Sequence, residues 1–268
     1  MKKTIGLLAI MLIALFLGGC TLNNKDKDNI NYNNSDNQED VTEIQNEDNE
    51  NDEEEKALIE ARDEALRVSL ENNSKQAAYT AMSLSADAKS LNIASRESQA
   101  KYSLNEILNG VPTFVVGTSN KIEGQIMVDD TATPAKIKIG DISLDATSFK
   151  SDKDLRDKNL INLMLRSNLE ENRYIVFKTT EVKGVPETLV KDQSFPIEII
   201  GNLAILGNVE PVTFTGNATW KADNTLAGSV STDLAYEDFG LYIPDLPFLS
   251  NVDKIVKLDI NLKTESNK

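Results

Sequence analysis

The feature that most constrains this chain is an alternation of apolar and polar residues that recurs from about residue 100 to residue 262. An apolar side chain at every second position is typical of a β-strand with one buried face. Turn-forming residues separate the alternating segments, as in Leu206–Pro211 and Lys221–Thr225. Roughly eight strands of this kind in about 175 residues predict an all-β antiparallel domain, either a sandwich or a closed barrel.

Two interruptions break the alternation. At Gly140 it slips by one position, which predicts a β-bulge that bends the strand. The segment Ser151–Asn168 instead has helical spacing, with Leu155 and Leu163 on one face. In a barrel, a short helical insert of this kind lies at a mouth, where it can close the opening or act as a gate.

The N-terminus has the order of a secretory signal peptide over residues 1–19. Lys2 and Lys3 precede the apolar run Ile5–Phe16. This run is too short to span a bilayer, which takes roughly 20 residues. The ending LGGC resembles a bacterial lipobox, so Cys20 is the expected site of lipidation by palmitate or a similar acyl group; a plain membrane-anchor helix is the alternative. We therefore expect a lipoprotein of the cell envelope, anchored to a membrane on its extracytoplasmic side, in the periplasm or at the cell surface.

Residues 20–52 form the next expected region, a spacer rich in Asn, Asp and Glu. Thr21–Lys56 contains 13 acidic and 3 basic residues, which accounts for most of the net charge of −15. Such a segment has too few apolar residues to offset the entropy of ordering it, so we expect it to be disordered. Residues 53–88 are expected to be helical or irregular, with a short amphipathic helix over Glu53–Glu71, and residues 89–265 to form the β-domain.

The composition excludes several classes of function. The chain has no histidine and one cysteine, whereas Ser-His-Asp and Cys-His catalysis need an imidazole and zinc sites usually need His or Cys. No basic patch suits a phosphate backbone. We therefore expect no catalytic residues, no metal, no cofactor and no nucleic-acid partner.

Several segments, in their order and spacing, resemble the YceI-like family over about Leu91 to Lys263. The segments that carry the resemblance are SQAKYSLNEIL (Ser98–Leu108), VVGTSNKIEGQI (Val115–Ile126), LRDKNLIN (Leu155–Asn162), YIVFKTTEVKGVP (Tyr174–Pro186), IIGNLAILGNVEPVTF (Ile199–Phe214) and DFGLYIPDLP (Asp238–Pro247). The resemblance implies an extended antiparallel lipocalin-like β-barrel of about eight strands, with an interior tunnel for a long apolar molecule such as a polyisoprenoid, an isoprenoid quinone or a fatty amide.

The chain also departs from the family pattern. Ala204 replaces the usual Thr and Asn202 the usual Asp of one glycine-flanked segment, and no His lies in LRDKNL. A polar ligand end would then be bound by other groups at the mouth. The mouth candidates are Arg156, Asp157, Asn159 and Asn202, although a structural clamp is the favoured explanation of Arg156 and Asp157.

Alternation identifies the candidates for the tunnel wall. They are Ile122, Ile126, Ile142, Leu144, Ile175, Phe177, Phe195, Ile197, Ile199, Leu203, Phe214, Trp220 and Val230, with Gly124, Gly201, Gly216 and Gly228 expected to leave room between them. The aromatic members are equally explained as plain core. The expected function is that of a membrane-tethered binding or carrier protein for a long apolar ligand. The alternative is a ligand-free structural module of the cell envelope that binds a partner protein, and association into a homodimer is compatible with either.

Overall fold

The computed structural model describes residues 47–244 and 246–266, so the expected signal peptide, Cys20 and most of the expected spacer lie outside the described residues. The described residues divide into two units, with the boundary between Asn73 and Ser74. Helix α2 (Glu47–Thr80) has 34 residues and is longer than the expected helix over 53–71. Residues 53–71 of this helix consist mostly of Glu, Ala, Leu, Lys and Arg, which favour helix. Among the described residues, no helix is both long and apolar enough to cross a membrane.

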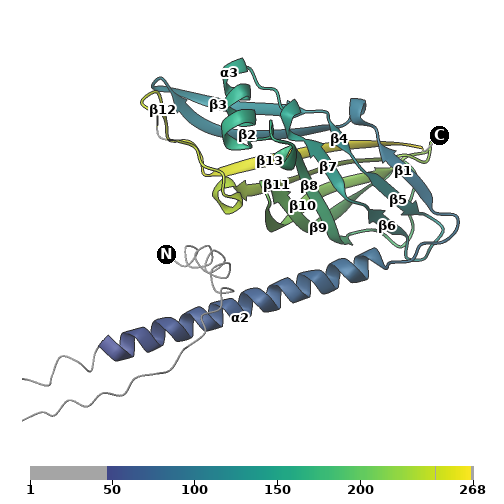
Figure 1. The fold of residues 1–268 in the computed structure, drawn as a ribbon. Coiled ribbons are helices and arrows are strands. Elements are labelled where there is room, and N and C mark those ends of the chain that lie inside the picture. Colours follow the sequence, from purple (N-terminus) through teal and green to yellow (C-terminus); the bar gives the residue numbers. More distant parts are fainter. Residues whose placement is uncertain (1–46, 245, 267–268) are drawn as a thin grey trace, which may run out of the picture. The chain divides into compact units, whose positions relative to one another are not determined.

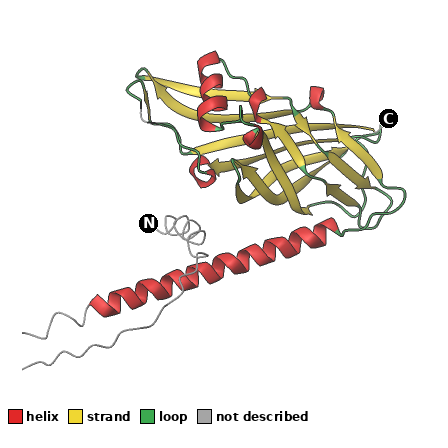
Figure 2. Cartoon of the chain, viewed as in Figure 1, coloured by secondary structure: helices red, strands yellow, loops and turns green. Residues whose placement is uncertain are grey.

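The second unit is mainly antiparallel β-structure (Figures 1 and 2). Its strands are β1 (Lys89–Ile93), β2 (Gln99–Leu108), β3 (Val111–Ser119), β4 (Ile122–Glu123), β5 (Gln125–Asp129), β6 (Lys136–Ile139), β7 (Ile142–Asp145), β8 (Tyr174–Lys183), β9 (Ser194–Ile205), β10 (Asn208–Trp220), β11 (Leu226–Ala235), β12 (Leu249–Ser250) and β13 (Ile255–Ser266). Several short strands are consecutive parts of one bent segment, namely β1 with β2, β3 with β4 and β5, and β6 with β7. Counted in this way, and leaving aside the two-residue β12, the prediction of an antiparallel fold of about eight strands is confirmed.

The sheet curls until its two ends meet. Neighbouring strands follow the order β4-β7-β8-β9-β10-β11-β13-β1-β5-β6. Because β4 and β5 are adjacent in the chain, this order returns to its starting point, which is the geometry of a barrel rather than a sandwich. The other end is different: β3 pairs only with β2, and its free edge has a single bridge between Thr118 and Lys150. The barrel is therefore closed at the end formed by β1, β5 and β6 and open beside β3.

The register confirms the predicted bulge. Ile126 pairs with Ile139, whereas Ile122 pairs with Leu144. The five residues 122–126 on one strand thus oppose the six residues 139–144 on the other. Gly140 still lies opposite Gln125, and Glu123 pairs with Ser143, so the extra residue falls at 141–142, directly after Gly140. The resulting bend directs β7 to pair with β8, while β6 pairs with β5.

The C-terminal end of α2 belongs to the second unit and contacts the sheet between β6 and β8, which do not pair with each other. The backbone N–H of Ile139 donates a hydrogen bond of 2.7 Å to the Tyr79 hydroxyl oxygen. The Gln76 side chain donates one of 3.1 Å to the carbonyl oxygen of Thr179. These side chains satisfy backbone groups that a neighbouring strand would otherwise satisfy. Burial raises the pKa of Tyr79 to about 12.

The closed end is filled by packed side chains. Trp220 is fully buried there, and its Nε1 donates a hydrogen bond of 3.1 Å to Asp130. The ammonium group of Lys191 lies 4.0 Å from the centre of the indole ring, a cation–π contact. This packing seals one end of the barrel.

Candidate functional site

A cavity of about 890 Å³ occupies the barrel on the open side of this core. Side chains from the inner faces of β2, β7, β8, β9, β10, β11 and β13 line it, and most are aliphatic or aromatic. Phe177 and Phe214 meet edge to face in its wall, with ring centroids 5.3 Å apart. A volume of this size lies within the range of ligand sites, roughly 300–1,000 Å³. The interior can therefore hold a molecule of considerable size, provided that the molecule is apolar.

The structure places the predicted tunnel residues in two groups. Ile122, Ile142, Leu144, Ile175, Phe177, Ile199, Leu203, Phe214 and Val230 line the cavity, while Ile126, Phe195, Ile197 and Trp220 do not. The second group belongs to the packed core. All thirteen were selected by alternation, which reports the face of a strand but not the height along the barrel axis. An eight-stranded barrel is narrow enough for its own side chains to fill it, and at the closed end they do.

The expected role of the glycines is wrong. None of Gly124, Gly201, Gly216 and Gly228 lines the cavity. A Cβ on Gly201 would lie 2.5 Å from the ring of Phe177 and 2.4 Å from the carbonyl oxygen of Lys178. At Gly216 a Cβ would lie 2.0 Å from the carbonyl oxygen of Ser229. These two glycines allow neighbouring groups to approach closely, so they do not widen the interior.

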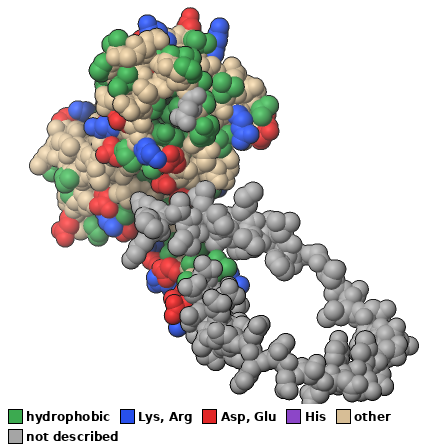
Figure 3. Space-filling model, turned by 90° about the vertical axis from the view of Figure 1, so that its left-hand side faces the viewer, with side chains coloured by type: hydrophobic (Ala, Val, Ile, Leu, Met, Phe, Trp, Pro, Cys, Tyr) green, Lys and Arg blue, Asp and Glu red, His purple; other side chains and the backbone are tan. Residues whose placement is uncertain are grey.

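The helical insert lies at the open end, as predicted. It consists of α3 (Asp154–Asn159) and a π-helical turn over Leu160–Met164. Leu155, Leu160 and Leu163 line the cavity from this side. Figure 3 shows the end of the barrel that carries α3 and β12 in Figure 1, and hydrophobic side chains gather over its upper part.

Arg156 connects the insert to the barrel wall. Its Nη2 donates a hydrogen bond of 3.0 Å to the Glu106 carboxylate on β2, and its Nη1 pairs with Asp152. Burial acts to lower the pKa of Arg156, but the two carboxylates outweigh it and raise that pKa. Arg156 and Asn159 both line the cavity, at its polar margin.

The other two mouth candidates are located elsewhere. Asp157 is buried, and its Oδ1 accepts hydrogen bonds from the backbone N–H and hydroxyl of Ser151, at 2.8 Å and 2.7 Å. It is thus the structural clamp of the insert. Asn202 lies on β9 between Gly201 and the cavity-lining Leu203, so it is on the outer face of the sheet and not at the mouth. Strand alternation itself requires this, because neighbouring residues point to opposite faces.

Sequence reasoning missed two parts of the cavity wall. Tyr102 lines the cavity, and burial raises its pKa to about 12; its alternation with Ala100 and Leu104 was a signal that it faces inward. The irregular segment between β11 and β13 contributes Leu241, Ile243 and other apolar residues. Its apolar residues recur with neither the spacing of a strand nor that of a helix, so only their high frequency could have indicated that the segment is buried.

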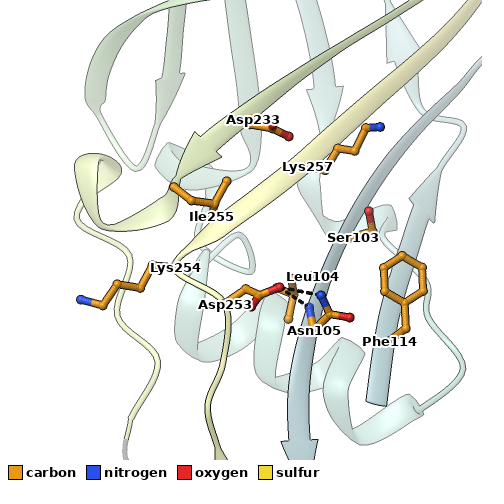
Figure 4. Close-up of a pocket in the computed structure, with 9 residues that line it drawn as sticks. All are labelled: Ser103, Leu104, Asn105, Phe114, Asp233, Asp253, Lys254, Ile255 and Lys257. Atoms are coloured by element: carbon orange, nitrogen blue, oxygen red, sulfur yellow. Dashed lines mark hydrogen bonds between the residues drawn. The ribbon is translucent and has the colours of Figure 1, made fainter. Parts of the chain in front are cut away.

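A second hollow of about 380 Å³ lies among β2, β3, β11 and β13, near Phe114 and Asp253 (Figure 4). The Asp253 carboxylate accepts hydrogen bonds of 2.9 Å and 2.8 Å from the backbone and side-chain nitrogens of Asn105. Lys254 pairs with Glu237 and Lys257 with Asp259. The hollow is smaller, and the charged side chains of Asp233, Asp253, Lys254 and Lys257 line it, so it suits an apolar ligand poorly. Within the described residues, no three acidic, Cys or His side chains are placed to hold a metal ion.

An antiparallel barrel that encloses an apolar cavity defines a lipocalin-like protein. The family model described as "YceI-like domain" matches residues 91–264, and the chain belongs to this family. No curated protein matches the chain.

Solved structures with a similar fold include a polyisoprenoid-binding domain from Saccharophagus degradans implicated in plant cell wall breakdown. It has 11% sequence identity and a TM-score of 0.50, over 66% of this chain and 98% of that one. BcnA from Burkholderia cenocepacia has 15% identity and a TM-score of 0.48, over 64% of this chain and 98% of the other. A YceI protein from Campylobacter jejuni has 13% identity and a TM-score of 0.43, over 57% and 84% of the two chains. At 11% identity, the similarity to the polyisoprenoid-binding domain shows a shared fold and nothing more.

Proposed function

We propose that this protein binds and carries a long apolar molecule of the polyisoprenoid, isoprenoid quinone or fatty amide type. The observation that supports it is the cavity of about 890 Å³, closed at one end and apolar over most of its wall. A barrel without a ligand role would be expected to fill with its own side chains, as the closed end does. The binding of a polyisoprenoid by a protein of the same fold agrees with this choice of ligand class.

The size of the cavity limits the ligand. At about 30 Å³ for a group as large as a water molecule, 890 Å³ accommodates on the order of 30 such groups. If such a chain buried about 400 Å² of apolar surface, the gain would be roughly 10 kcal/mol at 25 cal/mol per Å². This is comparable to the cost of association, about 4–15 kcal/mol. Binding would therefore rely on length and apolar character more than on a few polar contacts.

The polar margin of the cavity favours a ligand end without strong charge. Arg156 is already neutralised by Glu106 and Asp152. Breaking such a pair to bind an anion would leave a carboxylate partly buried and unpaired, which is costly. Hydroxyl, carbonyl and amide ends could instead use Asn159 or Tyr102, both of which line the cavity.

We further propose that acyl groups on Cys20 tether the protein to a membrane of the cell envelope on its extracytoplasmic side. The support is the order of residues 1–20, a signal sequence that ends in LGGC. Several acyl chains on one residue provide a stable anchor, since each buried CH₂ contributes about 0.8 kcal/mol. A tether would confine exchange to the membrane that supplies an apolar ligand. The mechanism is burial rather than chemistry, so we propose no enzymatic activity.

Mass spectrometry of the full chain, purified from its own host, tests the carrier proposal. Spectra under native and denaturing conditions separate a bound ligand from covalent acyl groups, because only the bound ligand is lost on denaturation. We expect one apolar molecule per chain. The double variant Phe177→Asp, Leu144→Asp should lose it, whereas Val190→Asp, Val209→Asp adds the same charges at positions 55% and 57% exposed and should retain it. A native mass without ligand, together with no uptake of polyprenols or fatty amides, would leave the structural-module alternative.

A further inference from the structure

The open end of the barrel exposes apolar side chains that also line the cavity. Leu155 is 69% exposed, Leu163 66% and Phe248 49%, and all three contribute to the cavity wall. Tyr242, 69% exposed, lies between the lining residues Leu241 and Ile243. Val111, 60% exposed, pairs with the lining residue Leu108. We call Val111, Leu155, Leu163, Tyr242 and Phe248 the mouth face.

A hydrogen bond, a strand pairing and an ion pair show that the segments of the mouth face are neighbours. The backbone N–H of Asn109, in the turn between β2 and β3, donates a hydrogen bond of 2.7 Å to the carbonyl oxygen of Phe248. Leu249 on β12 pairs with Leu108 on β2. The ion pair between Arg156 and Glu106 joins the insert to the same strand. The exposed apolar groups therefore surround one opening, and Figure 3 shows hydrophobic side chains gathered on this end.

The insert also differs in charge from the rest of the chain. Residues 151–168 contain four basic and three acidic residues, whereas the whole chain has a net charge of −15. Lys153, Lys158 and Arg166 are exposed and, within the part of the chain that the structure describes, form no ion pair. Exposed cations thus lie in the same short segment as the exposed Leu155 and Leu163.

We propose that the mouth face docks onto the surface of a lipid bilayer that contains anionic lipids. Apolar side chains that enter the acyl boundary, with basic residues beside them at headgroup level, are the pattern of interfacial membrane-binding segments. Aromatic residues such as Tyr242 are also favoured at this interface. Docking would bring the cavity opening to the acyl chains, so that an apolar molecule passes between bilayer and cavity without crossing water. This route rests on the proposed carrier function, but the docking itself does not.

A protein partner is the competing occupant of this face. Burial in a protein interface would need a surface of complementary shape and would favour few unpaired charges at its centre. The mouth face instead consists of protruding side chains around an opening, with unpaired cations beside them. A fluid bilayer adapts to such a surface, and its anionic headgroups complement the cations.

Quenching of tryptophan fluorescence by brominated acyl chains tests the docking. The full chain has one tryptophan, Trp220, which is fully buried in the closed end. We would introduce Leu163→Trp at the mouth face, and Val190→Trp as a matched control that is 55% exposed next to the closed end. With brominated phosphatidylglycerol vesicles, roughly half or more of the added signal should be lost for Leu163→Trp, because interfacial segments reach about 5–10 Å into the acyl boundary. The signals of Val190→Trp and of Trp220 should be unchanged.

Charge provides a second readout. Adding Lys153→Gln and Lys158→Gln to Leu163→Trp should reduce quenching severalfold on anionic vesicles, and high salt should have the same effect. Equal quenching of Leu163→Trp and Val190→Trp would overturn the docking, and the mouth face would then be assigned to a protein partner. Mass spectrometry of the same samples keeps the two proposals apart. A bound ligand without quenching contradicts docking alone, and quenching without a ligand contradicts the carrier function alone.

Discussion

The Tyr79→Phe substitution tests whether the end of α2 is part of the barrel wall. The Tyr79 hydroxyl oxygen accepts the hydrogen bond from the backbone N–H of Ile139 at 2.7 Å. Ile139 is only 6% exposed, and its side chain lines the cavity. Phenylalanine retains the ring and removes only the acceptor. The substitution therefore leaves a buried N–H without a partner at the edge of β6.

The expected cost follows from this geometry. An unsatisfied buried backbone group costs about 1–3 kcal/mol, and the short distance and low exposure of Ile139 suggest a value near 2 kcal/mol. Each kcal/mol shifts the melting temperature by about 2–4 °C in a domain of 150–250 residues. We therefore expect Tyr79→Phe to lower the melting temperature by roughly 4–8 °C.

Urea unfolding followed by Trp220 fluorescence measures the effect, because this single tryptophan reports on the barrel core. Tyr242→Phe removes the same hydroxyl at a position that is 69% exposed, and it should change the free energy of unfolding by less than about 0.5 kcal/mol. If the two variants are equally stable, the reasoning is refuted and the Tyr79 hydroxyl contributes nothing to the stability of the barrel.

Three further predictions concern the cavity wall and the insert. Gly201→Ala should destabilise the protein by about 1–3 kcal/mol in urea unfolding, since its Cβ would meet the Phe177 ring at 2.5 Å. Gly228→Ala, whose Cβ would have its nearest neighbour at 3.4 Å, should be close to neutral. A larger loss of stability for Gly228→Ala than for Gly201→Ala would contradict the packing. Asp157→Asn should cost about 1–3 kcal/mol because it weakens the acceptor for two donors at the start of the insert, and faster hydrogen exchange confined to residues 150–169 would show it. Burial raises the pKa of Tyr102 from 10.0 to about 12. The neutral Tyr102 side chain therefore contributes to the free energy of unfolding in full below pH 10, and this contribution, on the order of 2–3 kcal/mol, is lost as the pH rises toward 12. Between pH 9 and 11.5 the stability of the wild type should fall more steeply than that of Tyr102→Phe, and parallel curves would argue against a buried hydroxyl.

The positions of many cavity residues followed from a local property of the chain. Ile142, Leu144, Ile175 and Phe177 were assigned to the barrel interior by alternation, and all four line the cavity. A period of two follows from the pleat of the strand, so it can be recognised without tertiary contacts. The same is true of the bulge at Gly140, where the slip in alternation matches the extra residue in the register.

Other features depend on contacts between segments distant in the chain. Phe195 and Trp220 alternate as regularly as Phe177, yet they fill the closed end, because the height of a residue in the barrel depends on how all the strands are staggered. Tyr79 and Ile139 are 60 residues apart, and their contact exists because β6 and β8 do not pair. The sequence alone therefore determined most of the strands, many of their inward faces and the helical insert, since these follow from local periodicity and turn chemistry, whereas β1 and β3 were not predicted. Only the tertiary structure decided where the packed core ends, where the cavity begins and which end is open, since these depend on the closure of the sheet.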